Sequence, residues 1–336
     1  MIASTQQART VRELGERGLI ERITTRLTMP SWVVVGPGDD AAVIEPERGA
    51  LEVLTTDVQV EGVHFDRRFV PPDAIGHRAL AVNLSDLAAM GATPRVALLS
   101  LVLPDSMDVA CVDGLLDGLL ALAATHKVVV VGGNISRSPG PMMVDVTVVG
   151  AVKRRRVLTR SGARPGDGVY VTGSIGDALV GLQSLKAARG PVPPACQERY
   201  LRPQPRVRAG MLLGRNRAAS ACMDLSDGLA DAVRQVAEAT RVGITLDAGA
   251  LPIGDEVRRW HDAQGTAVID AAVGGGDDYE LLFTVRPAHR GRLRDARRTL
   301  GGLPVTKIGM VTKQRQLFIR TDAGQRQLPE GFDHFR

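Results

Sequence analysis

The sequence predicts an α/β (α+β) protein of two domains, built from mixed β-sheets flanked by helices. Three observations support this fold class. The chain has 336 residues, which favours about two domains of ordinary size. Hydrophobic residues make up 44% of the chain and aromatic residues only 3%, so the cores must consist mainly of Ala, Val, Leu and Ile, as in α/β proteins. Strand-like and helix-like segments also alternate along the chain.

In the first half, short apolar runs that stop at Gly, Asp or Pro predict strands, and apolar residues at helical spacing predict helices. The predicted strands are residues 32–36, 51–57, 96–104, 127–133 and 141–152. The fourth of these strands leads into a glycine turn. Residues 72–92 and 108–126 predict helices.

A basic run, KRRR (153–156), follows the last of these strands. We place the domain boundary near residue 152, which gives an N-terminal domain of residues 1–152 and a C-terminal domain of residues 153–336. Residues 165–185 read as strand, glycine turn and helix, and residues 222–240 as a short strand and a helix. The further predicted strands of the second half are residues 242–247, 277–285 and 306–311.

The composition argues against several classes of protein. The formal charge is +5, but the basic residues are scattered and not interleaved with aromatic ones, so a nucleic-acid partner is not expected. The run KRRR is more typical of a solvated connector. Three widely spaced cysteines favour neither a disulfide scaffold nor a zinc site, and fit a reducing compartment. No leader pattern and no apolar run near 18 residues is evident, so we expect a cytoplasmic protein without a membrane segment.

Adjacent aspartates follow a glycine turn twice, in GPGDD (36–40) and GGGDD (274–278). Neighbouring carboxylates repel each other, so this arrangement favours either a solvated loop or a cation site. NLSDLAAM (83–90) is also echoed by DLSDGLAD (224–231). Each places Ser-Asp just ahead of an Ala-rich helical stretch, so the echo indicates either two ordinary helix N-caps or a shared acidic site.

The common nucleotide and zinc motifs do not explain these acids. No G-x-x-x-x-G-K-[ST] and no H-E-x-x-H occurs, and GPGDDA is a poor dinucleotide fingerprint because two carboxylates would face the pyrophosphate. Oxygen-only clusters at the ends of strands suit Mg²⁺ that bridges carboxylates and phosphates. The sequence therefore predicts a phosphate site with several magnesium ions. The acids on which it depends are Asp39, Asp40, Asp57, Asp86, Asp224 and Asp227.

Seven segments occur in a characteristic order from about residue 12 to the end of the chain. They are GPGDDAAVI, TTDVQVEGVHF, ALAVNLSDLAAMGATP, LTRSGARPGD, MDLSDGLADAV, GGGDDYELLFTV and GFDHF. Together they resemble the thiamine-monophosphate kinase family. The resemblance implies the fold of aminoimidazole ribonucleotide synthetase, with N-terminal strands of two subunits associating in a homodimer. It also implies transfer of the γ-phosphoryl group of ATP to thiamine monophosphate, which gives thiamine diphosphate. A phosphate oxygen is already anionic, so no residue acts as a general acid or base, and catalysis comes from metal ions and positioning.

The resemblance assigns roles to residues of this chain. The implied magnesium ligands are Asp40, Thr55, Thr56, Asp57, Asp86, Asn134, Asp224 and Asp227, and Asp39 acts beside them. Thr55 and Thr56 ligate through hydroxyl or backbone oxygens. The implied ATP contacts are Gly133, Asn134, Arg160 and Ser226. The implied contacts to thiamine monophosphate are His64, Asp277 and Phe332.

Three positions depart from the family pattern. Asn134 stands where the family usually has Asp, Asp277 where it usually has Glu, and Phe332 where Tyr or Trp is common. The loss of one charge at Asn134 also favours an alternative, which is a non-catalytic or altered-substrate nucleotide-binding relative of the same superfamily. Taken alone, His64, Arg160 and Phe332 also fit a buried strand residue, a surface cation and a tail anchor, respectively.

Overall fold

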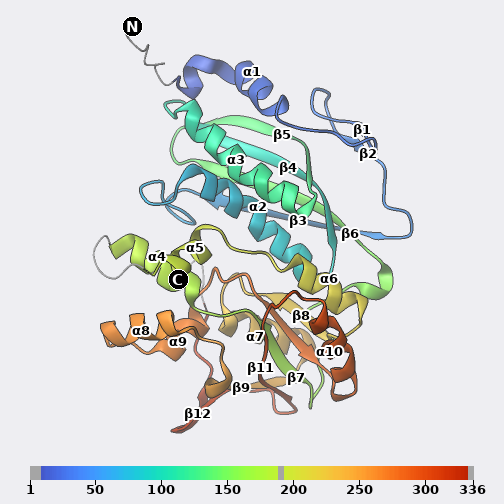
Figure 1. The fold of residues 1–336 in the computed structure, drawn as a ribbon, viewed down its shortest axis with the longest axis vertical. Coiled ribbons are helices and arrows are strands. Elements are labelled where there is room, and N and C mark those ends of the chain that lie inside the picture. The colour runs from blue at the N-terminus through green and yellow to red at the C-terminus, as the bar shows by residue number, and fades with distance from the viewer. Residues whose placement is uncertain (1–8, 188–192, 332–336) are drawn as a thin grey trace. The chain divides into compact units, whose positions relative to one another are not determined.

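The computed structural model describes residues 9–187 and 193–331 (Figure 1). Contacts within the chain divide it into two compact units. The first unit comprises the chain up to Asn83 together with Pro94–Gly150, and the second comprises Leu84–Thr93 together with the chain from Ala151 onward. Helices and strands alternate through both units, and the larger sheet contains both parallel and antiparallel pairs, so the predicted class of α/β protein with mixed sheets is confirmed.

The first unit contains a four-stranded sheet in the order β3-β6-β4-β5, with β4 parallel to β5, and a small antiparallel ribbon of β1 and β2. Helices α2 and α3 lie over one face of the sheet (Figure 1). The elements are α1 (Val11–Thr24), β1 (Val33–Val35), β2 (Val43–Ile44), β3 (Leu51–Val60), α2 (Pro72–Ala89), β4 (Thr93–Pro104), α3 (Val109–His126), β5 (Val129–Ser138) and β6 (Met143–Val152).

Two glycines let α2 and α3 approach each other closely. A Cβ added at Gly76 would lie 1.8 Å from the carbonyl oxygen of Leu115, and one at Gly118 would lie 1.8 Å from that of Asp73. No side chain fits at either position, so the two helix backbones pack in direct contact.

By length and composition α3 is apolar enough to cross a membrane, which the sequence analysis did not expect. Its apolar residues form a buried stripe that includes Val112, Leu115 and Leu119. Asp113 pairs with Arg22 of α1, and Asp117 pairs with Arg26, two residues after the end of α1. One apolar stripe with paired acids outside it is the pattern of a core helix, and the packing of α3 within the first unit explains its hydropathy.

Two strands of the first unit run further than predicted. Strand β3 continues through Asp57 to Val60, so Asp57 does not end it. Strand β5 continues through Gly132 and Gly133, so the predicted glycine turn is wrong. The pairing of β5 with β4 shifts register beside these glycines, and a Cβ at Gly133 would lie 1.8 Å from the carbonyl oxygen of Leu99. The glycines therefore permit an irregularity inside a strand.

The second unit contains a seven-stranded sheet in the order β13-β12-β9-β11-β7-β10-β8, flanked by helices (Figure 1). One core cluster of this unit is mainly aliphatic. Tyr170 and Phe283, both buried, stack on each other with ring centroids 5.6 Å apart. The elements are β7 (Gly168–Thr172), α4 (Asp177–Ala187), α5 (Pro194–Leu201), α6 (Val207–Arg215), β8 (Ala221–Asp224), α7 (Leu229–Thr240), β9 (Gly243–Asp247), α8 (Asp255–Gln264), α9 (Val268–Gly274), β10 (Leu281–Val285), α10 (Arg290–Arg298), β11 (Val305–Thr312), β12 (Leu317–Thr321) and β13 (Gly324–Gln327).

The register of β8 and β10 positions the candidate site of this unit. The two strands are antiparallel, and Asp224 at the end of β8 lies opposite Leu281 at the start of β10. The loop after β8 and the segment before β10 therefore leave the sheet at the same edge. The segment 277–280, predicted as strand, is not part of β10, because Asp277 and Tyr279 have φ of 68° and 49°.

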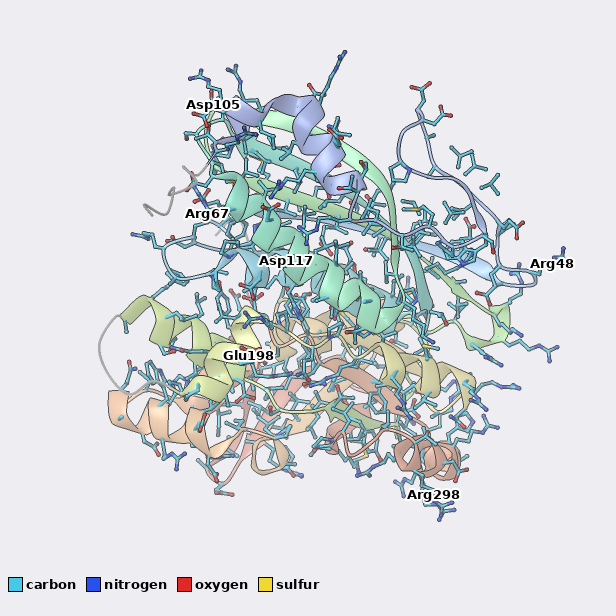
Figure 2. All side chains as sticks on the ribbon, turned by 45° about the horizontal axis from the view of Figure 1, so that its top comes forward. Arg48, Arg67, Asp105, Asp117, Glu198 and Arg298 are labelled. Carbon is cyan, nitrogen blue, oxygen red and sulfur yellow. The ribbon has the colours of Figure 1, made fainter. Side chains whose placement is uncertain are left out.

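Charged side chains of both signs are spread over each unit (Figure 2). Arg48 and Asp117 are exposed in the first unit, and Glu198 and Arg298 in the second. The run of residues 153–156 is also exposed, and Arg154–Arg156 form one turn of 3-10 helix after β6. The exposure of residues 153–156 agrees with the solvated connector predicted for this run.

Candidate functional site

In the first unit, Asp39 and Asp40 lie on the loop that joins β1 to β2, and both are exposed. The backbone N–H of Asp40 donates to Oδ1 of Asp39, at 2.9 Å. The ribbon that carries this loop packs through Val33 on Val96 and Val131 of the sheet. The acids are thus anchored through the ribbon while their carboxylates face solvent.

Thr55, Thr56 and Asp57 lie within β3, where successive side chains alternate between the two faces of the sheet. Thr55 and Asp57 are half-buried and share one face, whereas Thr56 is exposed on the other. The hydroxyl of Thr56 lies 3.1 Å from Oδ1 of Asp145 and 2.9 Å from the hydroxyl of Thr147, both on β6. Any ligand position that Thr56 shares with Asp57 must therefore use the backbone oxygen of Thr56.

Asp145 is a polar neighbour of this group that the sequence analysis missed. It lies on β6 in VDVTVV, where polar residues alternate with buried valines. That alternation, in a strand next to β3, was the available signal.

His64 lies in the turn after β3 and is half-buried, so it is not a buried strand residue. Its Nδ1 accepts a hydrogen bond from the backbone N–H of Val60, at 3.1 Å. A neutral imidazole whose Nδ1 accepts carries its proton on Nε2, so the ring presents a donor at that atom.

Gly133 and Asn134 lie on β5 opposite Leu99 and Ser100 of β4, and both are exposed. The structure thus places them on a strand at the edge of the sheet. The close approach of Gly133 to the Leu99 carbonyl fixes the backbone at this point.

In the second unit the two echoed motifs are joined by a hydrogen bond. The hydroxyl of Ser85 donates to Oδ2 of Asp224, at 2.7 Å, and both residues are buried. Ser85 and Asp86 lie inside α2, and the N-cap of α7 is Gly228, with no side-chain cap. Both N-cap interpretations are therefore wrong, and within this unit the two echoed segments meet at the contact between Ser85 and Asp224.

The loop after β8 is bonded to the segment before β10. The N–H of Asp277 donates to the carbonyl of Ser226, at 2.7 Å, and the N–H of Tyr279 donates to that of Leu225, at 3.0 Å. Gly228 has φ of 92°, and a Cβ there would lie 2.4 Å from the carbonyl oxygen of Gly275. The structure thus brings Asp224, Ser226, Asp227 and Asp277 together on one edge of the sheet.

Arg160 is exposed and lies in the segment that precedes β7. The carbonyl of Thr159 accepts a hydrogen bond from the N–H of Cys222, at 2.8 Å, which places this segment beside β8, the outermost strand of the sheet. Its Nη1 donates to Oε1 of Gln235, at 2.5 Å, and Nε2 of Gln235 donates to Asp231, at 2.6 Å. Helix α7 therefore orients this guanidinium through Gln235, a residue that the sequence analysis missed.

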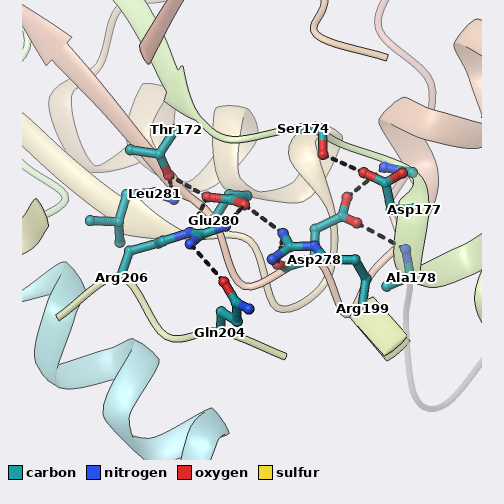
Figure 3. A network of polar contacts seen from close by, with 11 residues as sticks. Thr172, Ser174, Asp177, Ala178, Arg199, Gln204, Arg206, Asp278, Glu280 and Leu281 are labelled. Carbon is teal, nitrogen blue, oxygen red and sulfur yellow. Dashed lines mark hydrogen bonds and ion pairs between the residues drawn. The ribbon is translucent and has the colours of Figure 1, made fainter. Parts of the chain in front are cut away.

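A buried polar network lies behind this edge (Figure 3). Glu280 is fully buried, accepts from Arg199 and Arg206, and accepts from the Thr172 hydroxyl at 2.6 Å. Asp278 is also buried and accepts from the N–H of Gly176, at 2.8 Å. The sequence analysis missed this network, although DYE after GGGD, with three arginines in ERYLRPQPR, offered matched charges.

Burial raises the pKa of the Asp278 carboxyl to about 8, and the negative charge of Asp177 adds to the rise. The backbone N–H groups of Gly176 and Ala178, and the charge of Arg199, oppose it. The carboxyl of Asp278 is therefore mostly protonated near neutral pH.

The cysteines are unsuited to act as nucleophiles. All three are free, and Cys196 and Cys222 are buried. Burial, together with the charges of Asp177 and Glu256, raises the pKa of Cys196 to about 12. Burial also raises the pKa of Cys222, and Asp224 adds to this rise. Thiols of this kind remain protonated at neutral pH.

Comparison with known proteins identifies the family. Residues 38–152 match the AIR synthase related protein, N-terminal domain, and residues 164–322 match the C-terminal domain of the same family. The thiamine-monophosphate kinase of Bacillus subtilis (strain 168) is 35% identical over 331 residues, which cover 96% of this chain and 100% of that protein. This chain belongs to the thiamine-monophosphate kinase family.

Solved structures of thiamine-monophosphate kinases have the same fold. The enzyme from Stenotrophomonas maltophilia K279a is 36% identical, with a TM-score of 0.80, over 90% of this chain and 95% of that one. AaThiL complexed with AMPPCP and TMP is 34% identical, with a TM-score of 0.76, over 98% of this chain and 100% of that one. The predicted family, its two-domain AIR synthase-like fold and its kinase class are thereby confirmed.

The donors that a thiamine-monophosphate kinase would offer here fit magnesium by their chemistry. The candidate ligands are carboxylate, hydroxyl, amide and backbone oxygens, which hard divalent cations prefer. Asp224 supports the fit, because the residue is only 3% exposed and burial of a negative charge favours a nearby cation. Within residues 9–187 and 193–331, no three His, Cys, Asp or Glu side chains are grouped closely enough to hold a metal ion.

Phe332, the third predicted contact of the acceptor, lies outside the described residues. Its described neighbour Gly331 packs on α7, where an added Cβ would lie 2.8 Å from the Cβ of Asp231.

Proposed function

We propose that this chain transfers the γ-phosphoryl group of ATP to the phosphate of thiamine monophosphate, giving thiamine diphosphate and ADP. The observation that carries the proposal is the similarity, over nearly the whole chain, to AaThiL complexed with AMPPCP and TMP. The joined edge of Asp224, Ser226, Asp227 and Asp277 supports it, because these residues are the ones assigned to metal, ATP and acceptor.

The proposed roles divide between the two units. In the first, Asp40, Asp57 and the oxygens of Thr55 and Thr56 hold magnesium, Gly133 and Asn134 contact ATP, and His64 contacts the acceptor. In the second, Asp86, Asp224 and Asp227 hold magnesium, Ser226 and Arg160 contact ATP, and Asp277 contacts the acceptor. Bound magnesium would neutralise phosphate charge. Arg160, oriented by Gln235, suits bidentate contact with phosphate oxygens.

No general base is required in this proposal, because the attacking phosphate oxygen is already an anion. The side chains then bind the two substrates, hold the reacting oxygens in line and exclude water. We further propose a homodimer and a cytoplasmic location, as the family resemblance implies.

The proposal is tested by incubating the protein with ATP, Mg²⁺ and thiamine monophosphate and separating the thiamine phosphates by chromatography after oxidation to fluorescent products. We expect thiamine diphosphate from the wild type. Asp57→Asn should reduce kcat about 100-fold or more, because it removes a metal-binding charge.

Glu52→Gln is the matched control, since Glu52 is exposed on the same strand but points to the opposite face from Asp57. It should leave kcat within about twofold. Failure of the wild type to form diphosphate while it still binds ATP would favour the non-catalytic or altered-substrate alternative, which the uncharged Asn134 also favours.

A further inference from the structure

The segment before β10 has an unusual backbone. Within the described ranges, five non-glycine residues have positive φ. Lys127 and Arg241 are helix C-caps and Arg217 follows the end of α6, where this conformation is common. Asp277 and Tyr279 follow no helix directly and lie two residues apart, with φ of 68° and 49°. Each such conformation costs about 1–2 kcal/mol, so it persists only where the surroundings impose it.

The residues between and after them supply this constraint (Figure 3). The carboxyl oxygens of Asp278 accept from the N–H groups of Gly176 and Ala178, at 2.8 and 3.3 Å. Glu280 is held by Arg199, Arg206 and Thr172.

The main chain is fixed as well. The N–H groups of Asp277 and Tyr279 bond the loop after β8, and the N–H of Leu225 in that loop donates back to the carbonyl of Glu280, at 2.8 Å. The buried side chains of Asp278 and Glu280 are thus both held by hydrogen bonds, so the segment has little freedom to relax.

The consequence of this backbone is a contact between Tyr279 and Asp277. The phenolic hydroxyl of Tyr279 donates to Oδ1 of Asp277, at 3.2 Å. Tyr279 is only 6% exposed, so its ring is held by packing and its hydroxyl is a fixed donor. A carboxylate held by a fixed donor loses less freedom when it binds a ligand.

We propose that Tyr279 is a positioning residue for the acceptor substrate, acting through the carboxylate of Asp277. This inference rests on the proposed function, in which Asp277 faces the polar or cationic part of thiamine monophosphate. Asp278 and Glu280 hold the strained backbone, and Tyr279 sets the direction of the carboxylate. The ligand class is an acceptor with a cationic or amine-bearing ring.

The test compares Tyr279→Phe with the wild type. Loss of the hydroxyl should raise KM for thiamine monophosphate about tenfold, because a hydrogen bond to a charged group is lost. The kcat and the KM for ATP should stay within about twofold. Tyr170→Phe is the matched control, since Tyr170 is also buried in this unit but stacks on Phe283 in the core, and it should leave all three constants unchanged.

A double-mutant cycle separates positioning from a structural role. Asp277→Asn should weaken acceptor binding much less in the Tyr279→Phe background than in the wild type, because the two residues act through one contact. The proposal would be overturned if Asp277→Asn weakened acceptor binding equally in both backgrounds. It would also be overturned if Tyr279→Phe lowered kcat and raised the KM for ATP to a similar extent.

Direct binding of thiamine monophosphate, measured by calorimetry, distinguishes failure of this inference from failure of the proposed function. Tenfold weaker binding to Tyr279→Phe supports the inference even if no diphosphate forms. Equal binding to both proteins overturns the inference alone. A wild type that neither binds nor phosphorylates thiamine monophosphate overturns both.

Discussion

The candidate residues of the two units are held in place in different ways. In the first unit they lie on an exposed loop or on a strand, as Asp40 and Thr56 do. Asp40 bonds its exposed neighbour Asp39, and Thr56 contacts Asp145 and Thr147 on an exposed face of the sheet. In the second unit they lie beside fully buried partners, as Asp277 does beside Asp278 and Glu280. Buried polar side chains therefore hold Asp277 in the second unit, whereas regular backbone structure holds Thr56 in the first.

The largest expected effect comes from removing the buried charge in the second unit. Glu280→Ala leaves Arg199 and Arg206 without their shared carboxylate, so we expect the free energy of unfolding to fall by about 3–5 kcal/mol. Urea unfolding followed by circular dichroism measures it. Glu198→Ala is the control, because Glu198 pairs with Arg202 on the surface, and it should cost less than about 1 kcal/mol. Similar losses in the two variants would mean that the buried carboxylate stabilises the second unit no more than a surface ion pair does.

The second effect concerns pH and Asp278, whose pKa is raised from the ordinary 3.8 to about 8. The folded protein holds this proton more tightly than the unfolded chain. The protonated Asp278 therefore contributes its full stabilisation below about pH 4, and this stabilisation is lost as pH rises through about 8. The expected slope is a loss of up to about 1.4 kcal/mol for each pH unit in that range.

Unfolding measured between pH 5 and pH 8.5 checks this slope. Asp278→Asn should remove it, whereas Asp322→Asn, at an exposed position, should retain it. An unchanged slope in Asp278→Asn would show that another group dominates the pH dependence.

The smallest effect is expected in the first unit. Thr56→Val removes a hydroxyl that contacts Asp145 and Thr147 on an exposed face, so the free energy of unfolding should change by less than about 1 kcal/mol. Activity should also stay within about threefold, because only the backbone oxygen of Thr56 can act together with Asp57. Steady-state kinetics and thermal unfolding test both expectations, with Thr147→Val as the control. A tenfold loss of kcat in Thr56→Val alone would mean that the hydroxyl itself is a ligand.

Elements with strong periodicity could be predicted from the sequence. Residues 72–92 and 108–126 read correctly as helices, and residues 96–104 and 141–152 as strands, because burial imposes their pattern. The small helices α5, α6, α8, α9 and α10 were missed, since their short segments are stabilised by packing that the sequence does not display. Strand ends were misjudged where glycine was taken for a turn, as at Gly132 and Gly133.

The chemical type of the candidate site could be predicted from the sequence, but the residues that hold the site in place could not. Acids such as Asp224 and Asp277 are visible because one follows a short apolar run and the other is the first of two aspartates after a glycine turn. The partners that hold the site come from distant segments, such as Ser85 for Asp224 and Arg206 for Glu280. Pairings across such separations depend on tertiary packing, which local patterns do not encode.

Helix α2 has a consequence for the way in which this chain folds during synthesis. Its last turns belong to the second unit, where Leu84, Leu87 and Ala88 are fully buried and Ser85 bonds Asp224, 139 residues later. At ordinary ribosomal speeds of about 5–20 residues per second, this stretch waits roughly 7–28 s for its partner strand. During that interval its apolar side chains lack their native cover, so the nascent chain exposes a hydrophobic surface at which chaperones bind. A fragment that begins at residue 153 would lack the stretch altogether and leave the buried Asp224 without its hydroxyl donor.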